Sequence, residues 1–489
     1  MPYILSIDQS TTGTKGLIFN SEGELLYRYD LLHKQVTNDL GYVEHDPVEI
    51  YQNTIGVIKG VLKKSGLPKE EIAAVGICNQ RETVLGWNAL TGEPICNAVV
   101  WQCGRATDLC REFEDKADFI LKTTGLNLSP YFSGPKMAWI VRNVPVAKEL
   151  LVKDQLRFGT IDTWLVYKLT GGKEFKTDYS NASRTELMNI DTLKWDKEMV
   201  ELFGLKMSAL PDISYSDSIF GYTDFEGLLP MEIPICGVMG DSHAALFANG
   251  CTRPGMAKVT FGTGSSVMLN VGDRKVSPKP GVVASLAWGR GGRVEYVLEG
   301  NINYTGAVIK WLVDDIQLIE SSKESEILSK SITGTGGVYL VPAFSGLGAP
   351  HWNNDARAIL CGMNRTTKKA QIVRAAEECI AYQIRDVVEA MNGSYPQPLS
   401  SIFGDGGPTR DNFLMAFVSG MLNIPVQISE LEELSGAGSA YMAAISSRVS
   451  TMERLFSKRV TKTFVPQMEA EERERLYDGW KDAVAMLKK

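Results

Sequence analysis

Histidine is scarce in this chain, and neither histidine nor cysteine occurs in a metal-binding pattern. The sequence contains 4 His and 8 Cys among 489 residues, with no Cys-x-x-Cys pair. A zinc site needs such residues at short, regular spacings, so the sequence predicts none. Scattered cysteines in a chain of this length are typical of reduced, mostly buried thiols, and we expect a cytoplasmic protein.

Long apolar segments and dense runs of lysine and arginine are also lacking. No stretch approaches the roughly 18 apolar residues that a membrane-spanning helix needs, and the opening residues, MPYILSIDQS, do not resemble a secretion signal. The net charge of −7 at pH 7 argues against a nucleic-acid-binding protein. We therefore expect no nucleic-acid partner and no membrane insertion.

The length of the chain predicts two domains, because 489 residues exceed what one hydrophobic core normally supports. Short apolar segments, typical of buried strands, alternate with segments whose apolar residues recur at helical spacing. This alternation is typical of an α/β fold rather than a helical bundle or a β-sandwich. We place one lobe at residues 1–245, with an inserted cap at about 105–230, and a second lobe at 246–489. The boundary should fall near 235–255.

The apolar patterns also predict individual elements. We expect strands at 3–7, 17–19, 24–33, 72–80, 84–87, 98–101 and 233–239, and a strand–turn–strand unit at 258–271. We expect helices at 47–64, 105–123, 136–153, 196–204, 242–249, 304–330, 370–392, 412–422, 435–448 and 465–489. The Gly/Ala-rich helix 435–448 is expected to complete the second lobe.

The first hairpin, residues 3–20, has a turn suited to phosphate. Backbone N–H groups and hydroxyls in this turn, which includes Thr11, Thr12 and Gly13, can bind phosphate oxygens. Lys15 adds a positive charge, and Asp8 is a carboxylate that can hold a metal ion through water. Taken alone, the stretch is equally compatible with a solvated hairpin turn.

Two further glycine-rich turns strengthen this interpretation. Residues 258–271, KVTFGTGSSVMLNV, repeat the strand–turn–strand pattern about half a chain later, with Thr263 in the turn. The segment 404–407, which contains Gly406 and Gly407, lies between a strand and a helix, where glycine lets a ligand approach the backbone. Alone, this last turn is more often an ordinary helix cap. Together the turns indicate two lobes that close over a nucleotide.

Asp241 is the candidate general base. It follows the predicted strand 233–239, at the edge where ligands of open α/β sheets bind. A carboxylate there can accept the proton of an attacking hydroxyl, as in kinases. An interpretation of equal weight is that Asp241 caps the helix 242–249.

Charged and aromatic residues at strand ends are candidates for substrate binding. Arg81 and Glu82 follow the strand 72–80 and can bind the hydroxyls of a polyol. The alternative is a surface ion pair worth about 0–1 kcal/mol. Trp101 and Tyr131 can form an apolar wall beside a sugar-like ligand, although each aromatic alone is more often part of a core.

Many short segments, in order along nearly the whole chain, resemble the FGGY carbohydrate kinases and, within that family, the glycerol kinases. The similarity extends from Tyr3 to residues 436–444. The segments are IDQSTTGTK (7–15), EHDP (44–47), NQRET (79–83), VVWQCGR (99–105), PYFSG (130–134), GTIDTWLVYKLTGG (159–172), DYSNASRT (178–185), FGTGSS (261–266) and VPAFSGLGAPHW (341–352).

The resemblance implies two actin-like lobes of the ribonuclease H type with the active site in the cleft between them. It implies transfer of the γ-phosphate of ATP, with Mg²⁺, to a small polyol, which in the glycerol kinases gives sn-glycerol 3-phosphate. It assigns the polyol to Arg81, Glu82, Trp101, Tyr131 and Asp241, the base to Asp241 and magnesium to Asp8. It assigns the nucleotide to Thr12, Lys15, Thr263, Gly306, Gly407 and Asp411, beside Thr11, Gly13, Lys310 and Gly406. A homo-oligomer, dimer or tetramer, is expected by the same analogy.

Several positions depart from the usual pattern of that family. Ser242 stands where glutamine is usual, so we expect a hydrogen bond to the substrate to be lost or taken over by water, and the pocket to be larger. Lys15 replaces arginine and loses the bidentate fork. Lys310 replaces glutamine, Asp411 replaces asparagine, and Ser265-Ser266 replaces a bulkier pair. Ser242 leaves another short polyol or a ketopentose open as the substrate, and an actin-like ATPase without sugar chemistry is the alternative from another class.

Overall fold

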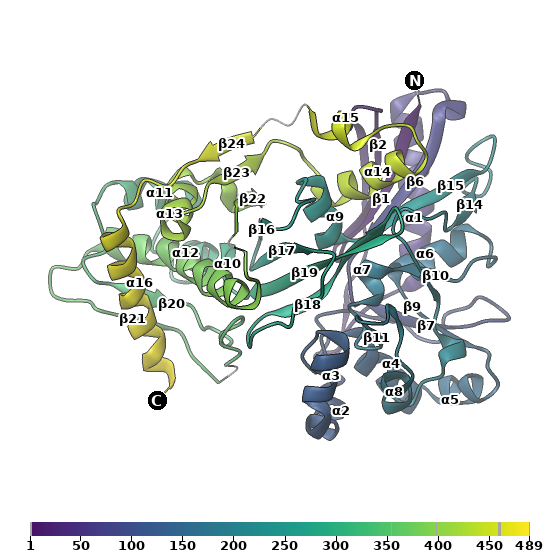
Figure 1. The fold of residues 1–489 in the computed structure, drawn as a ribbon, viewed down its shortest axis with the longest axis horizontal. Helices are drawn as coiled ribbons and strands as arrows, with labels where there is room; N and C mark the ends of the chain where they lie inside the picture. The colour runs from purple at the N-terminus through teal and green to yellow at the C-terminus, as the bar shows by residue number, and fades with distance from the viewer. Residues whose placement is uncertain (1, 354, 398, 458–460, 489) are drawn as a thin grey trace.

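Two mixed β-sheets form the centres of two lobes that lie side by side (Figure 1). The computed structural model describes residues 2–353, 355–397, 399–457 and 461–488. In spatial order, the first sheet contains β14 (Gly221–Thr223), β15 (Ile233–Gly240), β6 (Ile72–Asn79), β1 (Tyr3–Gln9), β2 (Gly13–Phe19) and β3 (Leu25–Leu32). The second contains β18 (Val283–Arg290), β19 (Arg293–Ile302), β17 (Ser265–Gly272), β16 (Met256–Phe261), β22 (Ser401–Asp405), β23 (Val426–Ser429) and β24 (Thr461–Phe464).

The two sheets repeat one pairing pattern. From β3 to β14 the pairs are antiparallel, antiparallel, parallel, parallel and antiparallel. From β19 to β24 the same sequence of pairs recurs, and β18 extends the other edge. The predicted hairpins at 3–20 and 258–271 are therefore confirmed, and they occupy equivalent places in the two lobes. The sequence analysis assigned no strands to 272–303, where β18 and β19 lie.

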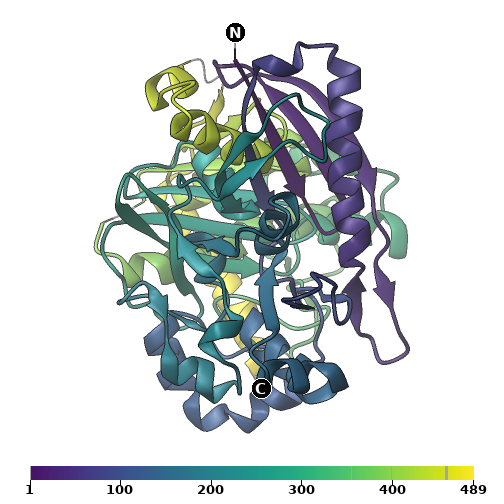
Figure 2. The ribbon, with the colours of Figure 1, turned by 90° about the vertical axis from the view of Figure 1, so that its right-hand side faces the viewer.

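Helices cover both faces of the first sheet, which explains its nearly continuous apolar strands. Helix α1 (Pro47–Ser65) and α6 (Ile161–Leu169) pack on one face, and Figure 2 shows α1 running along that lobe. Asp46 caps α1 by accepting a hydrogen bond from the Val48 N–H, and the helix ends at Gly66 in a left-handed conformation.

Helix α14 (Leu434–Ser446) covers the other face of the first sheet, although the sequence analysis assigned this segment to the second lobe. It packs against β1, β6 and β15 and against α9 (Asp241–Ala248). The approach is so close that a Cβ on Gly438 would lie 1.9 Å from the carbonyl oxygen of Ala244. The small residues of α14 thus serve close packing, but their pattern alone did not identify which lobe they contact.

Several predicted helices are shorter or divided. Residues 105–123 form α2 (Thr107–Glu112) and α3 (Ala117–Thr124), and 304–330 forms α10 (Gly306–Lys310), a π-turn and α11 (Ser322–Lys330). Residues 136–153 form α4 (Ser133–Asn143) and α5 (Pro145–Val152), because Pro145 lacks the N–H that would continue the first helix. The C-terminal helix α16 covers Ala470–Ala485, and residue 489 of the prediction lies outside the described residues.

The predicted cap region contains strands as well as helices, and β14 joins it to the main sheet.

Four smaller sheets lie in the cap and elsewhere in the described part of the chain. They contain β4 (Val36–Thr37), β5 (Val43–His45), β7 (Val84–Asn88), β8 (Ala98–Val99), β9 (Leu156–Thr160), β10 (Lys176–Asp178), β11 (Met188–Asn189), β12 (Lys194–Trp195), β13 (Asp212–Ser214), β20 (Tyr339–Val341) and β21 (Ile359–Cys361). The remaining α-helices are α7 (Tyr179–Ala182), α8 (Lys197–Leu202), α12 (Lys369–Ser394), α13 (Asn412–Leu422) and α15 (Met452–Ser457).

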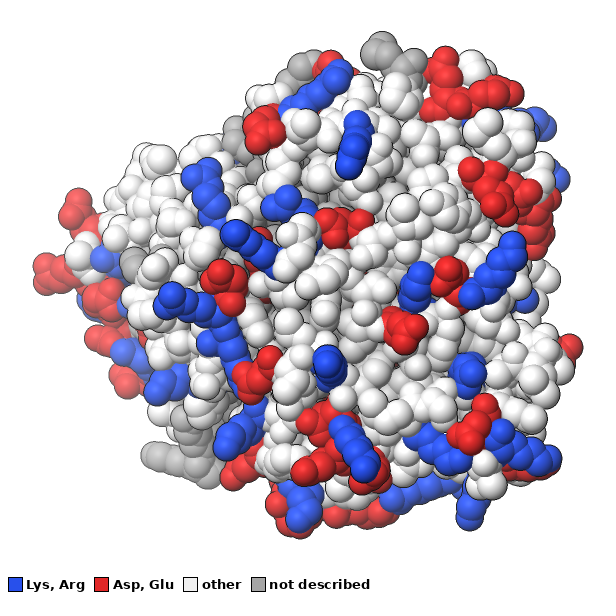
Figure 3. All heavy atoms as spheres, turned by 45° about the vertical axis from the view of Figure 1, so that its right-hand side comes forward, with Lys and Arg blue, Asp and Glu red and all other residues white. Residues whose placement is uncertain are grey.

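The surface carries positive and negative side chains interspersed over the face shown in Figure 3. All eight cysteines lie in the described part of the chain and are free thiols. Among the described residues, no helix combines the length and the apolar character needed to cross a membrane.

Candidate active site

An ion pair links the two lobes where their sheets approach each other. Arg81 follows β6 of the first lobe, and its two terminal nitrogens donate to the carboxylate of Glu299 on β19, at 2.8 and 2.9 Å. The side chains are only 5% and 0% exposed. Burial alone would raise the pKa of Glu299, but the charges of Arg184 and Arg81 hold it well below its ordinary value.

Arg184 and Glu82 extend this pair into a buried network. Arg184 Nε donates to Glu82 Oε1 at 2.6 Å, and Arg184 Nη1 lies 3.0 Å from Glu299 Oε2. Glu82 has a φ of 61°, an uncommon conformation for a residue with a Cβ. The interpretation of Arg81 and Glu82 as a surface ion pair is therefore wrong: both are buried, and each is paired with a residue distant in sequence.

Asp241 lies beside Arg81 at the start of α9. Arg81 Nε is 3.3 Å from Asp241 Oδ1, which also accepts a hydrogen bond from the Ser242 N–H at 2.6 Å. Gly240, and not Asp241, occupies the N-cap position, so Asp241 is not the predicted cap. Burial raises the pKa of Asp241 and Arg81 lowers it, with a net increase. A carboxylate that is one-third exposed (34%) and more basic than usual is suited to accept a proton.

The predicted aromatic wall lies beside the first hairpin turn. Trp101 Nε1 donates to Thr11 Oγ1 at 3.0 Å, and the rings of Trp101 and Tyr131 are 5.6 Å apart in an edge-to-face arrangement. Lys136 donates to the carbonyl oxygens of Tyr131 and Phe132 and so fixes this loop. Burial lowers the pKa of Lys136 to about 7.

Asp8 and Lys15 form a second charged group on the first hairpin. Lys15 Nζ lies 3.4 Å from Asp8 Oδ2 and 2.5 Å from Glu433 Oε2, and Cys78 donates to Asp8 Oδ1 at 3.2 Å. Burial raises the pKa of Asp8, although Lys15 opposes the increase. Lys15 therefore forms ion pairs with two carboxylates, those of Asp8 and Glu433.

Asp8 is suited to a magnesium ion that keeps most of its water. Over the described ranges, no group of three or more His, Cys, Asp or Glu is arranged to hold a metal. Magnesium is commonly bound by only one or two carboxylates together with water and substrate phosphates. A single buried carboxylate beside a phosphate-type turn fits that mode.

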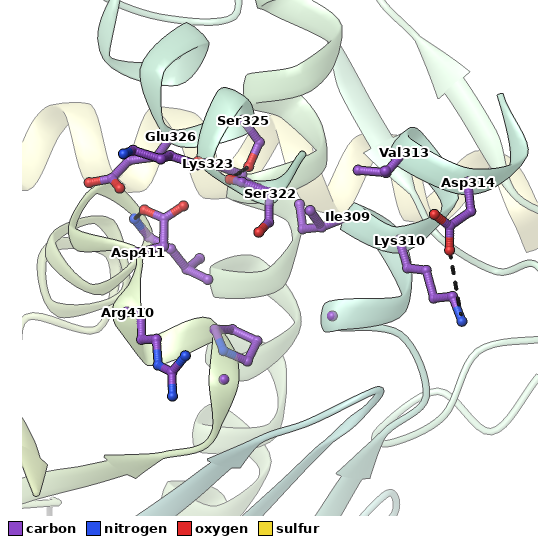
Figure 4. Close-up of a pocket in the computed structure, with 15 residues that line it drawn as sticks. Ile309, Lys310, Val313, Asp314, Ser322, Lys323, Ser325, Glu326, Arg410 and Asp411 are labelled. Carbon is purple, nitrogen blue, oxygen red and sulfur yellow. Dashed lines mark hydrogen bonds and ion pairs between the residues drawn. The ribbon is translucent and has the colours of Figure 1, made fainter. Parts of the chain in front are cut away.

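A cavity of about 720 Å³ in the second lobe contains four of the predicted nucleotide residues (Figure 4). Gly306, Lys310, Gly407 and Asp411 line it. Thr11, Thr12, Gly13, Lys15, Thr263 and Gly406 are not among the described residues that line it. The turn with Thr263 is nevertheless adjacent, because the Gly306 N–H donates to the Gly262 carbonyl and the Thr305 N–H to the Thr263 carbonyl, both at 2.9 Å. Gly406 has a φ of +99°, and a Cβ there would lie 1.9 Å from the carbonyl oxygen of Phe261.

Sequence reasoning missed four buried charged residues near these sites: Arg184, Lys258, Glu299 and Glu377. Lys258 lies on β16, and within the described part of the chain its Nζ has no hydrogen-bond partner. Burial lowers its pKa, while Asp405 and Asp241 oppose the decrease. A charge within an otherwise apolar strand was the available signal for Lys258 and Glu299, because an isolated charge is costly to bury.

Comparison with known proteins identifies the family. The model for the N-terminal domain of the FGGY family of carbohydrate kinases matches residues 3–248, and the model for its C-terminal domain matches residues 257–447. The chain belongs to the FGGY family of carbohydrate kinases. The predicted fold of two actin-like, ribonuclease H-type lobes is confirmed, and the actin-like ATPase without sugar chemistry is not supported.

FGGY kinases with similar sequences include named glycerol kinases. Glycerol kinase 1 of Thermotoga maritima is 46% identical over 490 residues, which cover 99% of each chain. The glycerol kinase of Caldanaerobacter subterraneus subsp. tengcongensis is 44% identical over 486 residues, 99% of this chain and 98% of that protein.

Solved FGGY structures show the same architecture. The structure of Plasmodium falciparum glycerol kinase with ADP matches with a TM-score of 0.95 at 34% identity, covering 100% of this chain and 98% of that one. A xylulose kinase from Lactobacillus acidophilus matches with a TM-score of 0.88 at 20% identity over 99% of both chains, which shows the shared fold alone.

Proposed function

We propose that this FGGY kinase transfers the γ-phosphoryl group of ATP to glycerol and produces sn-glycerol 3-phosphate. The identity of 44–46% to named glycerol kinases over nearly the whole chain supports glycerol as the acceptor. The observation that carries the mechanism is Asp241, more basic than usual and 3.3 Å from buried Arg81 at the junction of the lobes.

In this proposal the polyol lies between the charged network and the aromatic wall. Arg81 and Glu82 hold two hydroxyls, and Trp101 and Tyr131 contact the carbon chain. Asp241 accepts the proton of the third hydroxyl as its oxygen attacks the γ-phosphorus. The bond from that phosphorus to the bridging oxygen of ADP breaks, and ADP departs. Closure of the lobes keeps water from competing with the polyol.

The nucleotide extends from the hairpin turns into the cavity of the second lobe. Lys15 and the turns with Thr11, Thr12, Gly13 and Thr263 bind phosphates in this proposal. Gly306, Lys310, Gly406, Gly407 and Asp411 surround the ribose and base. Asp8 would hold magnesium, which would supply positive charge to neutralise the phosphates. Asp8→Asn should therefore raise the Mg²⁺ concentration needed for half-maximal activity, and an unchanged requirement would remove Asp8 from this role.

An ADP-release assay across acceptors tests the proposed substrate. We expect turnover with glycerol, and weaker or no turnover with longer polyols and ketopentoses. Activity on a ketopentose with none on glycerol would overturn the choice of substrate in favour of the alternative acceptor. Ser242 favours that alternative, because its short side chain leaves room beside Asp241.

The family resemblance and the free thiols support an assembly and a compartment. We propose a homodimer or homotetramer in the cytoplasm, as the resemblance and the free thiols suggest. Light scattering of the purified protein measures the mass directly, and a monomer at micromolar concentration would contradict the proposed assembly.

A further inference from the structure

A buried carboxylate, Glu377, lines the cavity proposed for the nucleotide. Glu377 lies on α12, is 1% exposed, and contributes to the wall of the 720 Å³ cavity. Among the described residues, no donor makes a well-aligned hydrogen bond to either oxygen of Glu377. A buried carboxylate normally has a hydrogen-bond or ion-pair partner. We therefore expect Glu377 either to carry a proton or to interact with a bound ligand.

Asp411 is the second carboxyl group at this place. It caps α13 by accepting a hydrogen bond from the Leu414 N–H at 2.9 Å, and it lines the same cavity (Figure 4). Glu377 and Asp411 lie within hydrogen-bonding contact of each other. Two carboxylates in such contact repel each other unless they share a proton.

The surroundings place that proton on Glu377. Burial and the charge of Asp411 raise the pKa of Glu377 to about 8, while the hydroxyls of Ser325 and Ser329 oppose the increase. Burial also raises the pKa of Asp411, but the contact with Glu377 lowers it. At neutral pH a protonated Glu377 donates to an ionised Asp411, which keeps free lone pairs facing the cavity.

The other walls of the cavity suit a flat aromatic base. Ile309, Val313 and Leu414 supply apolar surface, and Lys310, Lys323 and Arg410 add positive charge to the wall. Adenine carries an exocyclic amino group that donates hydrogen bonds. An ionised Asp411 can only accept hydrogen bonds, and it lines a cavity that is partly apolar. Its carboxylate is therefore complementary to the amino group of adenine.

We propose that Glu377 and Asp411 form a proton-sharing pair that recognises the amino group of adenine. The protonated carboxyl group of Glu377 donates a hydrogen bond to Asp411, and Asp411 accepts one from the adenine amino group. The inference rests on the proposed function for the use of ATP. It adds Glu377 as a positioning residue that acts through Asp411, and it implies that a proton binds together with the nucleotide.

The charges around the pair determine the sign of the pH effect. Glu326 of α11 faces Asp411 and is itself paired with Lys330, while Lys310 of α10 pairs with Asp314 of the following π-turn. Arg374 of α12 pairs with Glu378 and not with Glu377. Loss of the proton from Glu377 therefore adds a negative charge next to Asp411 and Glu326, in the cavity that receives the base of a nucleotide whose phosphates are themselves negative. Nucleotide affinity should fall as pH rises through about 8.

Calorimetric titration of the full-length protein with ADP from pH 6.5 to 9 tests this. We expect the wild-type affinity to fall by about tenfold between pH 7 and 9. In Glu377→Gln, which keeps a neutral donor of the same shape, the change should be less than about twofold. Glu389→Gln, the same substitution on the same helix but outside the cavity, should retain the wild-type fall. Equal falls in wild type and Glu377→Gln, or no fall in wild type, would overturn the proposal.

A second measurement needs no variant. At pH 8, ADP binding should take up about half a proton, measured in two buffers of different ionisation enthalpy. An uptake near zero would contradict the shared proton.

A third comparison tests whether Asp411 recognises the amino group of adenine. Inosine diphosphate, which lacks the amino group, should bind more weakly than ADP to the wild type, and Asp411→Ala should lose this preference. An equal preference in Asp411→Ala would contradict the assignment. ADP binding and glycerol turnover with none of these effects would refute this inference alone, whereas failure of any adenine nucleotide to bind would refute the proposed function as well.

Discussion

Arg81 and Glu299 come from the sheets of different lobes and form a two-point ion pair at 2.8 and 2.9 Å. Arg81 also contacts Asp241. Strand β19, which carries Glu299, leads directly into α10, whose first residue, Gly306, lines the cavity of the second lobe. One strand thus connects the proposed polyol and nucleotide sites.

Removing the charge of Glu299 should destabilise the protein strongly. Glu299→Gln leaves Arg81 and Arg184 buried without their shared counter-ion, and breaking a buried pair in this way costs about 3–5 kcal/mol. Urea denaturation measures the free energy of unfolding. Glu232→Gln, an exposed control, should stay within about 0.5 kcal/mol of wild type. A loss below about 1 kcal/mol in Glu299→Gln would show that the network is not essential to stability.

The same ion pair predicts a dependence of stability on pH. The folded-state pKa of Glu299 lies below its ordinary value of 4.5. Its charge therefore stabilises the fold above about pH 4.5, and this contribution is lost as pH falls toward the lowered value. The difference in unfolding free energy between wild type and Glu299→Gln should be constant from pH 5 to 8 and shrink below about pH 4.5. A difference that grew on acidification would have the wrong sign.

Asp241→Asn should abolish most turnover without abolishing binding. The amide cannot accept the hydroxyl proton, so we expect kcat to fall by about 10²–10⁴-fold. Glycerol binding, measured by calorimetry, should stay detectable because Arg81 and Glu82 are unchanged. The exposed control Asp39→Asn should behave as wild type. A variant at Asp241 that kept most of its rate would refute the role of this residue as the base.

Ser242→Gln tests whether the short side chain beside Asp241 sets the choice of acceptor. A longer amide should fill space and add a hydrogen bond, so the ratio of kcat/KM for glycerol over longer polyols should rise. Ser242→Ala serves as the control, because it removes the hydroxyl and adds no volume. An unchanged ratio in Ser242→Gln would mean that other residues determine specificity.

Gly438→Ala should destabilise the contact of α14 with α9. Its Cβ would meet the Ala244 carbonyl oxygen at 1.9 Å, and backbone must shift to relieve the overlap. Overpacking of this kind costs about 1–3 kcal/mol. Gly334→Ala is the matched control, because no atom lies within 4 Å of the added methyl group. Equal melting temperatures for the two variants would contradict the packing argument.

Local patterns predicted much of the fold. The hairpins at 3–20 and 258–271, the helix that begins at Pro47 and the buried strand before Asp241 all form as expected, because each depends on residues close together in the chain. The helix split at Pro145 was missed where helical periodicity continued across a proline. The strands between 272 and 303 were missed altogether.

By itself the sequence determined the strands of the two hairpins, their small-residue turns and the candidate residues Asp241, Arg81 and Glu82, since those features are encoded within short segments. Only the tertiary structure decided that Arg81 is neutralised by Glu299, that α14 returns to the first lobe, and that Glu377 lies against Asp411. Arg81 and Glu299 are 218 positions apart in the chain, and Glu377 and Asp411 are 34 positions apart. Whether a buried charge is tolerated depends on the partner that packing brings to it, and local sequence does not specify that partner.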